Sequence, residues 1–179
     1  MTTISKAKIL FIATDGFEQS ELLDPRQALL DAGAIVTLAS NKDSPIQGMK
    51  HHEKGDTIQP DVALSQVNAA DFDALVIPGG VANPDALRME EDALALVRAF
   101  FAASKPVAAI CHGPWLLAEA DVIEGRRLTS WPSIRTDLKN AGADVVDEQV
   151  VVDGNLITSR KPDDIPAFND AIIKAIEAA

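Results

Sequence analysis

The chain has 179 residues, 47% of them hydrophobic and 24% charged, a balance typical of one globular domain. Its formal net charge is −11 at pH 7, and it lacks the clustered Lys and Arg residues that neutralise phosphates, so no nucleic-acid partner is expected. A single cysteine excludes an intrachain disulfide. The first six residues do not form the apolar stretch of a signal peptide, and no apolar run of about 18 residues could cross a membrane. We therefore expect a cytoplasmic protein that does not contact a membrane.

Strands alternate with helices along the chain. Buried strands are expected at residues 8–14, 34–40, 72–78 and 107–110, with a short strand at residues 128–131. Pro25 after Asp24 predicts a helix that begins there and ends near Ala32. Residues 41–60 are polar, with Gly48, Gly55 and Pro60, and indicate an exposed hairpin or loop. A longer helix is predicted from about residue 85 to residue 103.

The C-terminal third continues the alternation. Ser133 is the expected N-cap of a helix that ends at Ala141, Asp153-Gly154 predicts a hairpin, and residues 163–178 predict a closing helix. This order favours one domain, residues 1–179, with an open and mostly parallel α/β sheet. Ligands of such sheets bind at the carboxyl ends of the strands, where three loops are expected to converge. These loops comprise residues 15–18, 79–85 and 111–113.

The only cysteine lies where the last buried strand meets a helix. Cys111-His112-Gly113 follows residues 107–110, and Pro114 suits the first turn of a helix that continues through Trp115. This is the arrangement of a nucleophile elbow, in which the helix N-terminus favours the thiolate and lowers the thiol pKa. The alternative is an unreactive buried cysteine, which is how single cysteines usually occur.

Four neighbours complete the predicted catalytic site. Glu18 is the expected acidic partner of the thiol, and as a protonated donor it would stabilise the thiolate; alternatively, it only starts a helix. His112 is the candidate general base, and Asp85, from this or a neighbouring subunit, is the carboxylate expected to orient it, although Asp85 also suits a helix start. The N–H groups of Gly80, or of the adjacent glycine, and of His112 are expected to form an oxyanion hole.

The remaining binding predictions concern residues around these groups. Gly79, Gly113 and Trp115 are assigned to substrate or oxyanion binding together with Gly80. No metal site is expected, because His51-His52-Glu53 is a cluster of adjacent residues without the spacing of a ligand set. The sequence contains neither a P-loop nor a G-x-G-x-x-G motif, so no nucleotide or other cofactor is expected.

Several segments together resemble the PfpI family of the DJ-one/PfpI superfamily, which has the class I glutamine amidotransferase-like fold. They are D-G-F-E, L-V-I-P-G-G-V-A-N-P-D, A-I-C-H-G-P-W-L-L, L-T-S-W-P-S-I-R-T-D-L-K-N-A-G-A, V-V-V-D-G-N-L-I-T-S-R and P-D-D-I-P-A-F, and they extend over nearly the whole chain. The resemblance implies a flavodoxin-like three-layer α/β/α sandwich and a homodimer or hexamer. By position, it makes Cys111 the nucleophile, Glu18 the glutamate beside it, His112 the family histidine and Gly80 an oxyanion-hole glycine.

Two positions differ from the family pattern. Asp85 stands where peptidase-type members carry a glutamate donated across a subunit interface, and Trp115 stands where several relatives carry a polar residue. Class I glutamine amidotransferases themselves need a histidine late in the chain, which this sequence lacks, since its three histidines are His51, His52 and His112.

The resemblance also implies the function. It favours a cysteine-dependent stress-response enzyme, glyoxalase-like or deglycase-like, that acts on reactive dicarbonyls or their protein adducts. The alternatives are an intracellular cysteine peptidase acting on peptides, and a redox-sensing stress or chaperone protein in which Cys111 is oxidised.

Overall fold

The computed structural model describes residues 3–179. Residues 1 and 2, which belong to the N-terminal stretch expected not to be a signal peptide, lie outside this range. Within it, a seven-stranded sheet forms the centre. In order across the sheet its strands are β11 (Val150–Asp153), β12 (Leu156–Ser159), β8 (Val107–Ile110), β7 (Ala74–Ile77), β1 (Lys8–Ile12), β3 (Ile35–Ser40) and β6 (Val62–Ala63). All neighbours are parallel except the β11–β12 hairpin, so the predicted mostly parallel sheet is confirmed.

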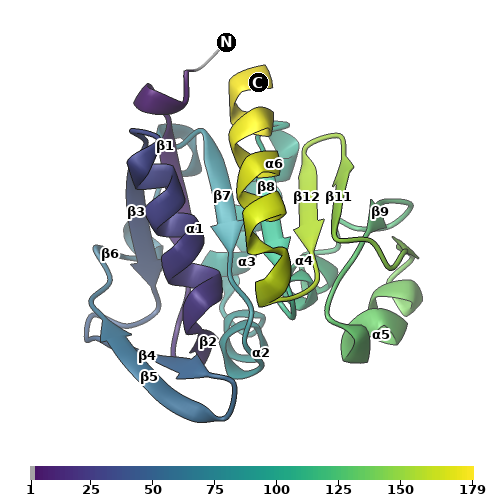
Figure 1. Ribbon diagram of the computed structural model, residues 1–179, viewed down its shortest axis with the longest axis horizontal. Coiled ribbons are helices and arrows are strands. Elements are labelled where there is room, and N and C mark those ends of the chain that lie inside the picture. Colours follow the sequence, from purple (N-terminus) through teal and green to yellow (C-terminus); the bar gives the residue numbers. More distant parts are fainter. Residues whose placement is uncertain (1–2) are drawn as a thin grey trace.

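Helices cover both faces of the sheet and make three layers (Figure 1). On one face α1 (Gln19–Asp31) and α6 (Ile165–Ala178) pack on Phe11, Val76 and their neighbours. The other face carries α2 (Ala82–Leu87), α3 (Glu91–Ala102), α4 (Pro114–Glu119) and α5 (Arg135–Asn140). Strands β1, β7 and β8 are almost wholly buried, which explains their continuous apolar sequences. The flavodoxin-like sandwich is therefore confirmed.

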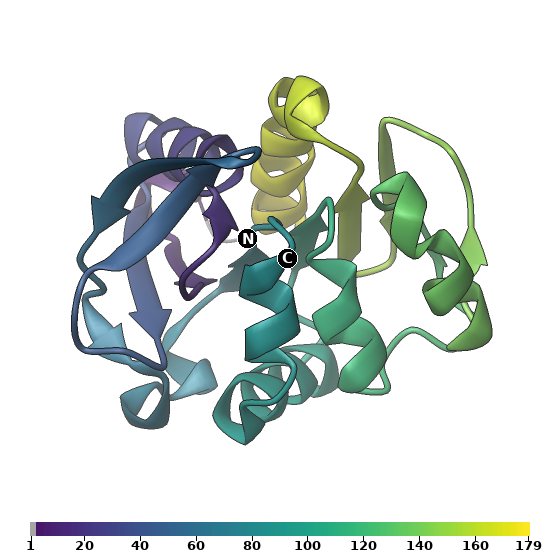
Figure 2. The same ribbon diagram turned by 90° about the horizontal axis from the view of Figure 1, so that it is seen from below.

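Two smaller sheets flank the central one. One contains β2 (Phe17–Glu18), β4 (Ile46–Lys50) and β5 (Glu53–Ile58), and the other pairs β9 (Arg127–Leu128) with β10 (Asp144–Val145). The β4–β5 hairpin confirms the exposed excursion predicted for residues 41–60. Seen from the carboxyl end of the sheet, this hairpin extends past α1 toward α6 (Figure 2). It thereby brings residues 51 and 52 to the end of the sheet where a ligand is expected.

Three predicted helix boundaries are wrong. Helix α1 begins at Gln19 and carries Pro25 in its interior, where proline forgoes one helical hydrogen bond; the helix is retained because its buried face packs on the sheet. The helix predicted for residues 85–103 is two helices, because Glu90 adopts an extended conformation and starts α3. Ser133 lies within a 3-10 turn, Pro132–Ile134, instead of capping α5.

Candidate active site

Cys111 occupies a sharp turn between β8 and α4. Its φ is +63°, a left-handed conformation that is costly for a residue with a side chain. The turn is held on both sides, because the Cys111 N–H donates to the Ser159 carbonyl at 3.1 Å and its carbonyl accepts from the Trp131 N–H at 2.9 Å. The geometry is that of the predicted elbow. The side chain is nevertheless 6% exposed, so the thiol is reached through a cavity and does not project from the surface.

Gly113 is required by the packing of this turn. A Cβ there would lie 2.9 Å from the carbonyl oxygens of both Ile110 and Ile77. Its N–H donates to Ile110 at 2.9 Å and is therefore unavailable to a substrate. Gly113 positions the elbow, and its predicted assignment to substrate or oxyanion binding is not supported by this geometry.

The glutamate beside the thiol is Glu21, which the sequence analysis missed. Glu21 lies in the first turn of α1 and is fully buried, with Oε2 accepting a hydrogen bond from the Gly79 N–H at 2.8 Å. The other carboxyl oxygen of Glu21, Oε1, is buried and has no hydrogen-bond partner among residues 3–179. Burial raises the pKa of Glu21 to about 8. The carboxyl is therefore mostly protonated near neutral pH and carries an O–H donor beside the sulfur.

Burial also raises the pKa of the Cys111 thiol, and the charge of an ionised Glu21 raises it further. This is opposite to the direction predicted from the helix start. The N–H groups of Gly80 and His112 act in the other direction and favour the thiolate. Because two negative charges in one buried site are unfavourable, the thiolate is favoured only while Glu21 keeps its proton.

The predicted position of Glu18 needs correction. Its Oε2 accepts a hydrogen bond from the His51 N–H at 3.0 Å, at the tip of the β4–β5 hairpin. Glu18 lines the same cavity as Cys111, but the carboxyl that interacts with the thiol belongs to Glu21. The misassignment follows from the helix start, because a helix beginning at Pro25 leaves Glu21 in a loop. The available signal was that Glu21 shares a helical face with Leu22, Pro25 and Leu29, all of them buried.

Of the two glycines after β7, only one has its N–H directed toward the sulfur. The Gly79 N–H is bound to Glu21, so Gly79 orients the carboxyl. Gly80 has φ +79°, and a Cβ there would lie 2.2 Å from the Gly16 carbonyl oxygen, so glycine is required for this close approach. The N–H groups of Gly80 and His112 both lower the pKa of the thiol, and their use as an oxyanion hole stays a prediction.

His112 contacts its neighbour directly. Its Nδ1 lies 3.2 Å from Cys111 Sγ, and its Nε2 lies 3.4 Å from Ser133 Oγ. The ring stacks on Trp131 with centroids 5.9 Å apart and makes a T-shaped contact with Trp115, with centroids 5.3 Å apart. Burial lowers the pKa of His112, so the imidazole is neutral near pH 7 and able to accept a proton.

The other two predicted residues lie outside the cavity. Asp85 is exposed on α2 and forms no hydrogen bond to His112 within the described chain. Trp115 donates its indole N–H to Asp137 at 2.9 Å and lies against Arg88. Trp115 therefore packs against the His112 ring without lining the cavity, and Trp131 is the tryptophan that lines it.

The cavity above Cys111 has a volume of about 640 Å³. It lies at the carboxyl ends of β7 and β8, where a ligand site was expected. Its walls come from six regions of the chain, including both histidines at the hairpin tip. The lining residues are Glu18, Glu21, His51, His52, Gly80, Val81, Cys111, His112, Trp131, Ser133 and Pro162. Residues 3–179 contain no cluster of three or more metal-ligating side chains.

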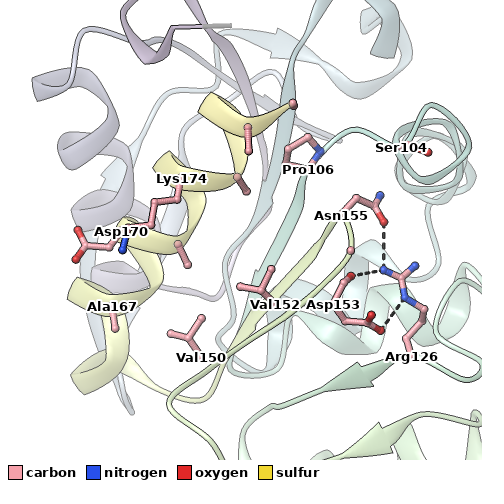
Figure 3. A pocket seen from close by; sticks show the side chains of 15 residues that line it. Ser104, Pro106, Arg126, Val150, Val152, Asp153, Asn155, Ala167, Asp170 and Lys174 are labelled. Carbon is pink, nitrogen blue, oxygen red and sulfur yellow. Dashed lines mark hydrogen bonds and ion pairs between the residues drawn. The ribbon is translucent and has the colours of Figure 1, made fainter. Parts of the chain in front are cut away.

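A larger cavity of about 1010 Å³ lies between the β11–β12 hairpin and α6 (Figure 3). Its arginine, Arg126, is already bound to Asp153 at 3.0 Å and to Asn155 at 3.1 Å. The walls that it shares with α6 are mostly alanine, and Cys111 is not among its lining residues. Within the described chain, the cysteine, the histidines and the buried carboxyl therefore line the smaller cavity and not the larger one.

Fold and site together define an α/β protein with its single cysteine on a strand–helix elbow. The model of the DJ-1/PfpI family matches residues 7–175, and the chain belongs to this family. Deglycase PfpI of Pyrococcus furiosus is 42% identical over 170 residues, covering 95% of this chain and 99% of the relative. Protein/nucleic acid deglycase 2 of Escherichia coli is 44% identical over 173 residues, covering 96% and 98%.

Two further similarities concern a stress protein and a solved structure. General stress protein 18 of Bacillus subtilis is 44% identical over 172 residues, covering 95% of this chain and 98% of the relative. The crystal structure of Drosophila melanogaster DJ-1beta superposes with a TM-score of 0.88 at 34% identity, covering 97% of this chain and 92% of that one. No helix within residues 3–179 has the length and hydropathy needed to span a bilayer.

Proposed function

We propose that this protein is a cysteine-dependent enzyme of the deglycase and glyoxalase kind, which acts on reactive dicarbonyls or on their protein adducts. The observation that supports this proposal is the arrangement around Cys111. A nitrogen of His112 lies 3.2 Å from the sulfur, the protonated carboxyl of Glu21 lies beside it, and two backbone N–H donors favour the thiolate. The names of the curated relatives support the same class of activity. No step of the chemistry below requires a metal or an organic cofactor.

The first step forms a covalent adduct. His112 accepts the thiol proton, and the sulfur attacks the aldehyde carbon of a 2-oxoaldehyde such as methylglyoxal. The C–S bond forms while the C=O π electrons move to oxygen, which faces the N–H groups of Gly80 and His112. Protonated His112 gives its proton to that oxygen, which yields a hemithioacetal and restores neutral His112.

The second step moves one proton between adjacent carbons. Neutral His112 removes the proton from the former aldehyde carbon, and the electrons form an enediolate whose ketone-derived oxygen takes the proton of Glu21. The hydroxyl of the first carbon returns a proton to Glu21, and protonated His112 delivers its proton to the next carbon as the C=O bond of the first carbon forms. The product is a thioester of the 2-hydroxy acid. Water then cleaves the C–S bond, so that methylglyoxal and water together give lactate and the free thiol. Glu21 replaces Glu18 as the carboxyl that serves this step.

The test is the consumption of methylglyoxal with formation of lactate, without added metal or glutathione. Cys111→Ser should abolish it, and an exposed-residue variant such as Asp31→Asn should leave it unchanged. Lactate formation that survives in Cys111→Ser would exclude the proposed mechanism. Loss of methylglyoxal no faster than in buffer would favour the redox-sensing or peptidase alternatives.

We also propose that the active form is a homo-oligomer, at least a dimer. Two large apolar side chains flank Asp85 and are solvent-exposed in one chain, Val81 at 57% and Met89 at 82%. An interface over this surface would bury them beside the cavity, and Asp85 would then face a neighbouring subunit. A strictly monomeric, fully active protein in analytical ultracentrifugation would exclude this role for Asp85. A reducing cytoplasm suits the mechanism, because it keeps the single thiol free.

A further inference from the structure

Glu18 lines the cavity but does not interact with the nucleophile as the sequence predicted. Its carboxylate is fixed by the His51 N–H at 3.0 Å, and its backbone is fixed by the pairing of β2 with β4, in which Glu18 aligns with Met49. The side chain is partly buried and faces the same space as Cys111 and Trp131. A carboxylate held in this way has a defined position in the cavity wall.

The groups that face Glu18 across the cavity carry little opposing charge. Glu21 is mostly protonated near neutral pH, and burial keeps His112 neutral. Glu18 is the carboxylate of the lining that is only partly buried, whereas Glu21 is fully buried. No Lys or Arg is among the lining residues.

The nearest arginines along the chain are already paired. Arg135, which lies two residues after the lining residue Ser133 in sequence, binds Asp147 at 2.8 Å. Arg160 lies two residues before the lining residue Pro162 in sequence. It binds Asp147 at 2.9 Å and the buried Asp164 at 2.8 Å. Lys50 and Lys54 flank the hairpin tip in sequence, but neither is among the residues that line the cavity.

We propose that Glu18 is a specificity-determining residue that selects by charge: it disfavours anionic carbonyl compounds, such as 2-oxo acids, relative to neutral 2-oxoaldehydes of the same size. The assignment to carbonyl compounds rests on the proposed function, whereas the charge selection at Cys111 does not. Two like charges within one partly screened cavity disfavour approach by roughly tenfold. Glu18 acts on the reagent in the cavity and takes no part in bond making.

Alkylation of the single cysteine tests this selection directly. Iodoacetamide and iodoacetate have nearly the same size and both transfer a substituted methyl group to the thiolate with loss of iodide, but iodoacetate is an anion. The ratio of their second-order rates, divided by the ratio for free glutathione under the same conditions, isolates the charge selection of the cavity. Any change in thiol pKa alters both rates together and cancels.

Glu18→Gln is the informative variant, because the amide oxygen can still accept from the His51 N–H while the charge is removed. Glu53→Gln is the matched control, since Glu53 is an exposed carboxylate of the same hairpin outside the lining. We expect the wild type and Glu53→Gln to disfavour iodoacetate similarly, and Glu18→Gln to reduce this discrimination by about tenfold. Equal ratios in all three proteins, or equal reductions in both variants, would overturn the proposal.

Methylglyoxal turnover separates this inference from the proposed function. With turnover established in the wild type, glyoxylate should inhibit Glu18→Gln about tenfold more strongly than it inhibits the wild type. Turnover together with an unchanged alkylation ratio would refute charge selection alone. A changed ratio without any Cys111-dependent turnover would refute the proposed function and leave charge selection standing.

Discussion

Glu21 and Cys111 form a coupled pair: the carboxyl of the first helix lies beside the thiol of the elbow, anchored by the Gly79 N–H at 2.8 Å. Burial raises the pKa of both groups. At least one proton is therefore retained between them over the neutral pH range, and the thiolate becomes accessible only opposite a protonated Glu21. The first two predictions follow from this pair.

Thiol reactivity should depend on a donor at position 21. Glutamine offers an N–H in place of the carboxyl O–H and cannot ionise, whereas leucine offers neither. At pH 7 we expect Glu21→Gln to be alkylated by iodoacetamide within about threefold of the wild type, and Glu21→Leu to react about tenfold more slowly, which corresponds to about one pKa unit. Mass spectrometry of the single cysteine measures both rates. Equal rates in all three proteins would mean that Glu21 does not act on the sulfur.

The pH dependence of stability should also identify Glu21. The carboxyl keeps its proton up to about pH 8 when folded, compared with a reference value of 4.5. Its raised pKa therefore stabilises the fold fully below pH 4.5, and this contribution is lost as the pH rises toward 8. The wild type should lose up to about 5 kcal/mol of unfolding free energy relative to Glu21→Gln across this window.

Urea unfolding of both proteins at pH 5 and pH 8 measures this difference. The unfolding free energy of Glu21→Gln relative to the wild type should increase with pH. A difference that stays constant, or that decreases, would show that Glu21 ionises in the folded protein as it does in the unfolded chain.

His112 should control the acid limb of the activity profile. Because burial lowers its pKa, the imidazole remains a base below the usual value of 6.5, and activity should fall only at lower pH. His112→Ala should reduce kcat/KM for methylglyoxal at least about tenfold. Ser133→Ala removes the contact at Nε2 and should shift this limb, while Ser133→Thr should restore it. An acid limb that is unchanged in Ser133→Ala would exclude this positioning role.

Gly113 should be intolerant of a methyl group. An alanine Cβ would lie 2.9 Å from two backbone oxygens that cannot move independently of the sheet. We expect Gly113→Ala to cost about 1–3 kcal/mol of stability and to slow alkylation of Cys111 by displacing the elbow. Thermal unfolding and the alkylation rate test this expectation. Wild-type values of both would contradict it.

Much of the fold could be predicted from local sequence patterns. Strands β1, β7 and β8 are short apolar runs, and the elbow is encoded by adjacent residues from Cys111 to Pro114. The prediction of a deglycase-like enzyme agrees with the names of the relatives. Helix boundaries were less predictable, because tertiary packing retains Pro25 inside α1.

The errors in the predicted site have two causes, a wrong helix start and contacts between segments distant in sequence. Placing the helix start at Pro25 concealed Glu21, so Glu18 was assigned to the thiol in its place. The participation of His51 and His52 depends on where the β4–β5 hairpin extends, which periodicity within the hairpin does not encode. The different uses of the Gly79 and Gly80 N–H groups likewise depend on a carboxyl distant in sequence.

The most direct test of the central claim is a single-turnover experiment with methylglyoxal followed by intact-mass analysis. The account predicts a transient adduct of one methylglyoxal on Cys111, formed without metal or glutathione and replaced by free protein as lactate appears. Cys111→Ser should show neither the adduct nor lactate. Lactate produced without any adduct on the wild type, or an equal rate in Cys111→Ser, would contradict the account.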